Sequence, residues 1–355
     1  MFRAIVILSA LILDLIFGDP PNHFHPLMLM GRWLSFGRRL ALDRTLTTRR
    51  QFWFGTIWTL IGIGLFAWPF WKLESKRGKK QPNTQKHKNS KTSSPTFYFS
   101  SLHPSSFILH PLLLIPSAFL RASLHPLLLK PIFAYRGLRQ AVKAVASALA
   151  NNDLAEARRL LSWHLVSRDT SALSEAEVVG AAIESLAENL TDSLTTPLLV
   201  YAAGGLPAAW AYRFINTADA MWGYRTPEFE QLGKFPAHLD DALNWLPARL
   251  TGWLLVVAAW LSGNDARHAA RTMLAQHHHT ASPNAGWTMS AMAGALGITL
   301  TKRGVYELAG GQNDLNVITI KRALRLADIC VGLSVATICL GLIAARVFGQ
   351  TRSAR

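Results

Sequence analysis

Two long apolar segments constrain the fold of this chain more than any other feature. Residues 52–73 and 329–345 carry almost no charge, and basic residues bracket both of them, namely Arg49, Arg50, Lys72, Arg325 and Arg346. Their length suits a hydrocarbon core of about 30 Å. Half of the chain is apolar and only 16% is charged, whereas an average soluble domain is about 25% charged. We therefore predict an all-α, multi-pass integral membrane protein.

Three shorter apolar runs leave the number of membrane spans open. Residues 4–17 are short for a span and include an acid, so a buried or interfacial helix explains them equally well. Residues 197–212 and 250–261 are near or below the minimum length, so they are re-entrant or buried unless they extend. Because basic residues flank both ends of the long segments, the positive-inside rule gives no orientation.

The net charge of +16 is spread unevenly. Residues 72–91 hold eight basic residues and one acid, Glu74, in a Lys-, Asn- and Ser-rich tract that is typical of a disordered linker. Three Leu-His-Pro copies follow, and the proline after each histidine argues against a metal site. We interpret residues 73–133 as an insertion and expect residues 75–105 to be dispensable for activity.

Helical periodicity dominates the rest of the chain. Residues 138–150 and 153–166 show apolar i, i+3, i+4 recurrence, with Asp153 as a cap. The sequence contains no phosphate-binding GxxxxGK[ST] loop, and its basic run lacks the interleaved aromatics of a nucleic-acid site. We divide the chain into an N-terminal segment with the first span (1–72), the insertion (73–133), a helical core (134–328) and a C-terminal membrane helix with a basic tail (329–355).

An acidic stripe stands out in this basic chain. Glu184, Glu188 and Asp192 recur every four residues on one side of a helix predicted over residues 178–194, nearly opposite its apolar face. Three such carboxylates suit Mg²⁺, which prefers oxygen ligands that it shares with substrate phosphates. A solvated helix face explains the same spacing, although i,i+4 carboxylates without basic neighbours repel one another.

Four further clusters place polar residues beside apolar runs. Ser282 as N-cap and Pro283 at the first helical position predict a helix start, whose free amides suit a phosphate. Three adjacent histidines point in different directions on a helix, which disfavours a metal site. The clusters are Asn216 and Asp219 beside Arg213; Asp240 and Asp241 with Asn244 and Arg249; Ser282, Pro283 and Asn284; and the histidines 277–279.

Six strings in this chain together resemble one protein family. They are GDPPNHFHP (18–26), VSRDTSAL (166–173), AAIESLAENLTDSLTTPL (181–198), YRFINTADAMWGYR (212–225), HLDDALNWLPARLTG (238–252) and SPNAGWTMSAMAGALG (282–297). In this order they are similar to the cobalamin-biosynthesis proteins of the CobD/CbiB type, the adenosylcobinamide-phosphate synthases. The similarity covers roughly residues 4–72 and 134–345, and the chain departs from the family pattern at residues 73–133.

The resemblance implies a multi-pass enzyme of the inner membrane whose active site faces the cytoplasm. Such a ligase joins aminopropanol O-phosphate to a propionate side chain of adenosylcobyric acid, with ATP as co-substrate and Mg²⁺. We expect catalytic roles for Glu184, Glu188, Asp192, Asp240 and Asp241, the first three as Mg²⁺ ligands. We expect substrate or phosphate binding by Asp19, His25, Arg168, Asp169, Asn189, Arg213, Asn216, Asp219, Asn244, Arg249, Ser282 and Asn284.

Two non-catalytic alternatives stay open at this stage. The family is also similar to AmpE, a membrane regulator of β-lactamase induction, which would sense rather than catalyse. A membrane transporter should show polar interruptions in matching positions of two halves, and the sequence shows no internal repeat. The partners expected for the ligase are the corrinoid, aminopropanol phosphate and membrane lipid, without nucleic acid.

Overall fold

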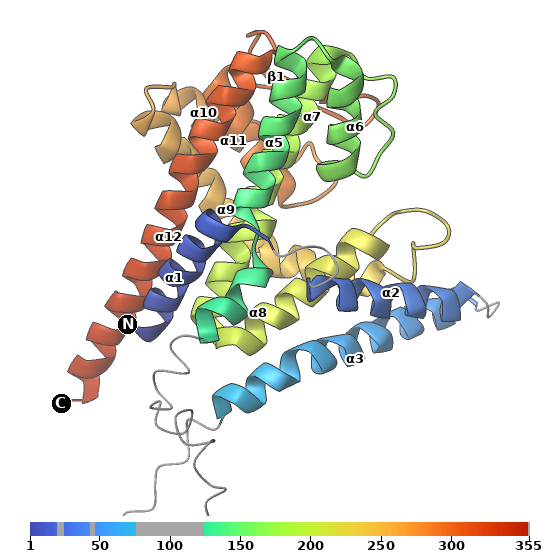
Figure 1. The fold of residues 1–355 in the computed structure, drawn as a ribbon, viewed down its shortest axis with the longest axis vertical. Coiled ribbons are helices and arrows are strands. Elements are labelled where there is room, and N and C mark those ends of the chain that lie inside the picture. The colour runs from blue at the N-terminus through green and yellow to red at the C-terminus, as the bar shows by residue number, and fades with distance from the viewer. Residues whose placement is uncertain (20–24, 43–46, 76–123, 354–355) are drawn as a thin grey trace, which may run out of the picture.

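The computed structural model describes residues 1–19, 25–42, 47–75 and 124–353, and these residues are almost all helical (Figure 1). The N-terminal part comprises α1 (Phe2–Phe17), α2 (Leu27–Leu42) and α3 (Thr48–Ser75). The remaining elements are η3 (Lys130–Ile132), α5 (Tyr135–Ala150), α6 (Leu154–His164), α7 (Glu175–Leu190), η4 (Thr191–Thr195), α8 (Thr196–Trp222), α9 (Lys234–Leu261), α10 (Ala266–Gln276), α11 (Ala285–Leu296), β1 (Thr299–Lys302), β2 (Tyr306–Ala309) and α12 (Val317–Ser353).

Three helices of the described residues are long and apolar enough to cross a membrane: Thr48–Ser75, Lys234–Leu261 and Val317–Thr351. The first and third contain the two long apolar segments of the sequence. The second is α9, which extends the apolar run 250–261 toward the N-terminus and thereby meets the length requirement. Asp240 and Asp241 lie on this helix, ahead of its apolar run 250–261.

Side-chain caps mark the starts of two helices: α6 begins where the sequence predicts, whereas α7 begins three residues ahead of the predicted residue 178. Asp153 caps α6, because its side chain accepts a hydrogen bond from the amide of Glu156. Ser174 and Glu177 form a reciprocal capping box at the start of α7. Residues on every side of α7 are buried, and among them is the charged Glu184. Glu184 is therefore not on a solvated helix face, and Glu188 is half-buried.

A π-helical turn interrupts the helix that the sequence predicts over residues 178–194. The α-helix ends at Leu190, and η4 carries the chain through one wider turn into α8. The hydroxyl of Thr195 donates to the carbonyl of Leu190 at 3.0 Å and so adds a side-chain bond across that turn. Such turns are frequent at functional sites, and here the turn carries Asp192.

A kink divides α8 and is supported from α3. Gly205 has a φ of 72°, which lies in the left-handed region that glycine tolerates. The next amide, of Leu206, donates to Glu74 Oε1 at 3.1 Å, and His125 Nε2 lies 3.6 Å from the same oxygen. Glu74, the one acid in the basic tract, therefore ties the end of α3 to the kink.

The insertion proposed from the sequence is only partly described. Residues 124–129 are helical, and the adjoining Leu129, Ile132 and Phe133 are fully buried in the core. This end of the 73–133 segment is thus part of the packed structure. Residues 76–123, which include His103, His110 and almost all of the segment expected to be dispensable, lie outside the described residues.

Two pairs of neighbouring helices and one β-hairpin complete the fold. In Figure 1, α1 lies beside α12, and α2 runs along α3, each pair in contact. The strands β1 and β2 form a small antiparallel hairpin in which Thr299 faces Ala309 and Lys302 faces Tyr306. Sequence periodicity did not predict this hairpin. The ends of α7, α8 and α9, together with the start of α11, meet around the cavity described next.

Candidate active site

A cavity of about 580 Å³ is lined by carboxylates from four elements of the fold, and we call it the acidic cavity. We define it by Glu188 of α7, Asp192 of η4, Asp219 of α8, and Asp240 and Asp241 of α9. Asn244, Ser282 and Asn284 also line it. Eight residues predicted from the sequence, drawn from four separate strings, therefore come together at one place.

Two residues that line this cavity, Thr191 of η4 and Trp222 at the end of α8, each have a buried polar group without a partner in the described part of the chain. The hydroxyl of Thr191 and the indole N–H of Trp222 both line the cavity, and neither has a hydrogen-bond partner among the described residues. Buried polar groups are nearly always paired, and an orphaned donor costs about 1–3 kcal/mol. Both groups are therefore suited to hold a polar ligand or bound water.

A buried network holds the Asp240 carboxylate in place. Asn244, one turn later on α9, donates to its Oδ2 at 2.8 Å, and Asn216 of α8 donates to its Oδ1 at 3.3 Å. The Oδ1 of Asn244 in turn accepts from the hydroxyls of Thr196, at 2.5 Å, and Tyr212, at 3.0 Å. Two amide donors thus fix this carboxylate at the cavity wall.

Asp241 is tied to the segment that precedes α11. The amide group of Asn284 donates to its backbone carbonyl at 2.8 Å, and the Ser282 hydroxyl donates to its Oδ1 at 3.4 Å. The prediction that Ser282 and Pro283 begin a helix is wrong, because α11 starts at Ala285 with Asn284 as its N-cap residue. Ser282 Oγ instead accepts the amides of Asn284 and Ala285, so it closes a turn just before the helix.

Burial and nearby acids raise the pKa values of the three cavity carboxylates that lie outside α9, namely Glu188, Asp192 and Asp219. Burial first, then the neighbouring acids Asp240, Glu188 and Asp219, raise the pKa of Asp192 well above its ordinary value. Burial, followed by Asp241, raises the pKa of Asp219 to about 6. Burial likewise raises the pKa of Glu188, with Lys302 opposing. Clustered shifts of this kind in a cleft mark a candidate functional site.

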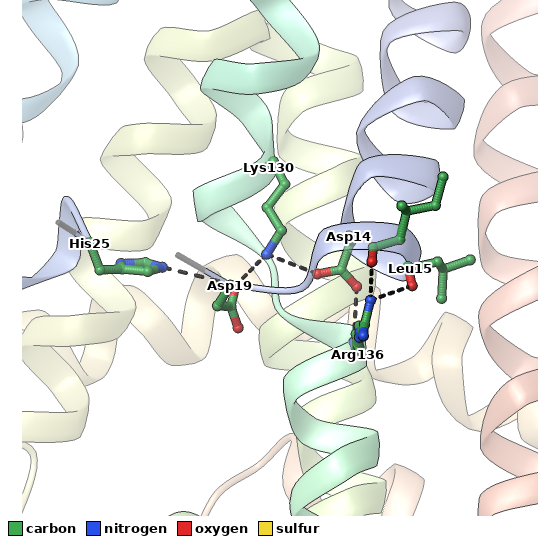
Figure 2. Close-up of polar contacts among 7 residues, drawn as sticks. Asp14, Leu15, Asp19, His25, Lys130 and Arg136 are labelled. Carbon is green, nitrogen blue, oxygen red and sulfur yellow. Dashed lines mark hydrogen bonds and ion pairs between the residues drawn. The ribbon is translucent and has the colours of Figure 1, made fainter. Parts of the chain in front are cut away.

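A second cavity, of about 820 Å³, lies between α2 and α8 and contains three other predicted residues. We call it the arginine cavity and define it by Arg32 and Arg39 of α2, Arg213 of α8, and Asp19 and His25. Figure 2 shows the Lys130 ammonium between the carboxylates of Asp14 and Asp19, with His25 on the far side of Asp19. Lys130 and Asp14 are both buried, and they hold the last turn of α1 against η3.

The other predicted residues lie outside both cavities. Glu184 forms an ion pair with Arg168 at 3.7 Å, and burial raises its pKa to about 7 despite that partner. Asp169 closes an exposed turn by accepting from Ser171. The side chain of Asn189 donates to the Ser185 carbonyl, and Asn216 reaches the acidic cavity only through Asp240. The Arg249 guanidinium stacks over Trp245 at 4.1 Å from its ring centroid.

Several residues that line the two cavities were not predicted from the sequence. Arg225, Lys234 and His238 bring basic groups to the acidic cavity. Arg225 and His238 lie inside the quoted strings, so their nearness to Asp219 and Asp240 was a usable signal. Arg32 and Arg39 belong to no string. Their spacing of seven, with Met28 and Phe36 on the same face, was the only available signal.

The donor set of the acidic cavity fits Mg²⁺. Within the described ranges no three His, Cys, Asp or Glu side chains form a ready-made metal group. Mg²⁺ does not require one, because it is usually bound by one or two carboxylates, waters and substrate phosphates. Glu188, Asp192 and Asp240 supply oxygens around one cavity. Burial raises the pKa values of Glu188 and Asp192, and a bound cation would offset the cost of ionising them there. Glu184 faces Arg168 and is not part of this set.

Comparison with known proteins places the chain in a family. The family model described as "CobD/Cbib protein" matches residues 7–330. A probable cobalamin biosynthesis protein CobD of Methanothermobacter thermautotrophicus is 36% identical over 329 residues, which cover 93% of this chain and 94% of that protein. The cobalamin biosynthesis protein CobD of Dehalococcoides mccartyi is 35% identical over 91% of this chain and 92% of its own length. No solved structure gives a significant match.

The fold and the cavity define a helical, membrane-type protein with a buried, carboxylate-rich site. The chain belongs to the CobD/Cbib protein family, as the resemblance of the six strings predicted. The relatives compared above carry names of cobalamin biosynthesis proteins, which supports a role in that pathway.

Proposed function

We propose that this protein is an ATP-dependent ligase of cobalamin biosynthesis. It joins aminopropanol O-phosphate to a propionate side chain of adenosylcobyric acid and so forms adenosylcobinamide phosphate. The observation that carries the proposal is the convergence of Glu188, Asp192, Asp219, Asp240 and Asp241 on one cavity. Family membership supplies the pathway, and the chemistry of amide formation accounts for the residues.

Making an amide from a carboxylate requires an activated carbonyl carbon. A propionate oxygen attacks the γ-phosphorus of ATP, the bond from that phosphorus to the bridging oxygen breaks, and an acyl phosphate and ADP result. The amine nitrogen then attacks the acyl carbon, and the carbon–oxygen bond to phosphate breaks and releases inorganic phosphate. The former ammonium loses two protons overall, one before the attack and one as the amide forms.

The residues of the acidic cavity suit this sequence of steps. Glu188, Asp192 and Asp240 would hold Mg²⁺, which would neutralise charge on the transferred phosphoryl group. Asp219 is a stronger base than an ordinary aspartate, because its pKa is about 6, and it remains ionised at neutral pH. It would accept the ammonium proton before the attack. The orphaned Thr191 hydroxyl and Trp222 N–H would bind polar atoms of the substrates.

The size of the cavity limits what enters it. A volume of 580 Å³ accommodates a propionate arm with the small amine but not a whole corrinoid. The ring would therefore remain outside, where Tyr224, which is 41% exposed and lines the cavity, offers an aromatic surface. All of the substrates are cytoplasmic compounds, so we place the opening of the cavity on the cytoplasmic side of the inner membrane.

An omission assay tests the proposal. Purified protein in lipid vesicles would receive adenosylcobyric acid, ATP, Mg²⁺ and aminopropanol phosphate, together or with one omitted. The expected result is amide product only in the complete mixture, with one ADP formed per amide. A regulator or transporter without ligase activity would give no amide in any mixture, and that result would overturn the proposal.

A further inference from the structure

The arginine cavity carries a basic face that the chemistry above does not use. Arg32 and Arg39 lie seven residues apart on α2, with Met28 and Phe36 between or beside them on the same helix face. Arg213 of α8 lines the cavity from the opposite side. Three guanidinium groups, each permanently charged, therefore border one space of about 820 Å³.

These three guanidinium groups have few ion-pair or hydrogen-bond partners among the described residues. Neither Arg32 nor Arg39 has an ion pair or hydrogen bond among the described residues, whereas the adjacent Arg38 pairs with Glu228 and lies over Phe229. Arg213 makes one long bond, of 3.3 Å, from Nη1 to Asn216 Oδ1, and its buried Nε has no partner in the described part of the chain. A buried guanidinium donor without an acceptor is destabilising, so an anionic ligand is the natural acceptor.

The acid at this cavity does not cancel the positive charge. Asp19 is engaged by the Lys130 ammonium, which also pairs with Asp14 at 2.9 Å (Figure 2). His25 Nε2 lies 4.0 Å from Asp19 Oδ1, on the side away from Lys130. The Asp14–Lys130–Asp19 group keeps one net negative charge, because two carboxylates share one ammonium. The three positive charges of Arg32, Arg39 and Arg213 exceed that single negative charge, so a positive surplus faces the cavity.

The shape and position of the cavity narrow the class of ligand. Its volume is far larger than a phosphate ion requires and suits a drug-sized molecule. Met28, Phe36 and Met221 supply an apolar wall on which a flat ring can pack. Arg213 also connects to the acidic cavity, because it donates to Asn216, which in turn donates to Asp240. Arg213 is thus separated from the Asp240 carboxylate by one hydrogen-bonded side chain, that of Asn216.

We propose that the arginine cavity binds a nucleoside triphosphate, with the base against Phe36 and the terminal phosphate at Arg213. The assignment rests on the proposed function in one respect, namely that a ligase with ATP as co-substrate needs a nucleotide site beside the acidic cavity. It explains how a chain without a known nucleotide-binding motif holds this co-substrate. Arg32 and Arg39 grip the phosphate chain, and guanidinium groups bind phosphate oxygens in bidentate fashion.

The test measures binding of the non-hydrolysable analogue AMP-PNP to the full-length protein in nanodiscs of zwitterionic lipid. Arg39→Gln and Arg32→Gln remove charges that face the cavity, and both side chains are exposed, so their replacement does not threaten folding. Arg38→Gln is the matched control, because it removes the same charge from the neighbouring position on another face of α2. We expect each cavity variant to raise the Kd about tenfold or more and the control to leave it within about twofold.

The alternative sources of phosphate chemistry are tested in the same format. Inorganic phosphate at the analogue's concentration should not displace it, and nanodiscs with anionic phosphatidylglycerol should not weaken its binding. Displacement by inorganic phosphate, competition by the anionic lipid, equal affinity in all variants, or no binding by the wild type would each overturn the assignment. The omission assay separates the two proposals. If the protein forms the amide but its KM for ATP is unchanged in Arg32→Gln and Arg39→Gln, only this nucleotide site is refuted and the ligase function stands.

Discussion

Asn244 donates a hydrogen bond to Asp240 at 2.8 Å across one turn of α9, and the other end of the same amide accepts from Thr196 and Tyr212. This one side chain therefore couples a carboxylate of the acidic cavity to two residues of α8. Its buried position also means that any replacement must leave at least one of those groups without a partner.

Replacement of Asn244 should impair turnover more than binding. Asn244→Ala frees the Asp240 carboxylate to rotate, and a misplaced group lowers the rate of a positioned reaction. We expect kcat to fall about tenfold or more with a smaller change in KM, measured by amide formation. Asn151→Ala, on an exposed turn after α5, is the control. Wild-type kcat in a folded Asn244→Ala protein would show that the network has no catalytic role.

Replacement of the cavity carboxylates should abolish most activity. Glu188→Gln keeps the shape of the side chain and removes its charge, so we expect turnover to fall about 10²-fold or more and the Mg²⁺ concentration for half-maximal rate to rise. Glu175→Gln makes the same change on an exposed first-turn residue of the same helix and should leave both quantities near wild type. Equal behaviour of the two variants would remove Glu188 from the site.

The raised pKa of Glu184 predicts how the stability of the protein depends on pH. Its pKa is about 7 in the folded protein against an ordinary 4.5, so the folded state holds a proton that the unfolded state releases between these values. Stability should fall as the pH rises from about 4.5 to about 7, by on the order of 3 kcal/mol, and then level off. Thermal unfolding at several pH values should show a smaller fall for Glu184→Gln. A fall of equal size in that variant would assign the effect to other groups.

The Lys130 cluster offers a double-mutant test of stability. Lys130→Met leaves Asp14 buried without its counter-charge, which should cost about 3–5 kcal/mol. Adding Asp14→Asn removes the stranded charge, so the double variant should recover much of the lost melting temperature. Additive losses in thermal unfolding would mean that the two residues do not depend on each other.

Local patterns in the sequence predicted much of the fold. The apolar recurrence over residues 138–150, the Asp153 cap and the two long apolar segments correspond to α5, α6, α3 and α12. Each of these signals is local, because a helix face or a cap is decided by residues within one or two turns. The β1–β2 hairpin was missed because its short strands carry no clear alternation.

The site was harder to predict because it depends on tertiary packing. The regular spacing of Glu184, Glu188 and Asp192 predicted one stripe, but α7 is buried on all sides and ends at Leu190, so Glu184 faces Arg168 while the other two line the cavity. The arginine cavity unites α2 with α8, which are far apart in the chain. Spacing within one helix cannot reveal such a pairing.

The central claim is that ATP activates the corrinoid carboxylate by phosphoryl transfer, and an oxygen isotope tests it most directly. Adenosylcobyric acid labelled with ¹⁸O in the reacting propionate would be converted in the complete mixture, and the released products analysed by mass spectrometry. The account predicts one ¹⁸O atom in each inorganic phosphate, because the acyl phosphate keeps the substrate oxygen when its carbon–oxygen bond breaks. Label in AMP, or unlabelled phosphate formed together with the amide, would contradict it.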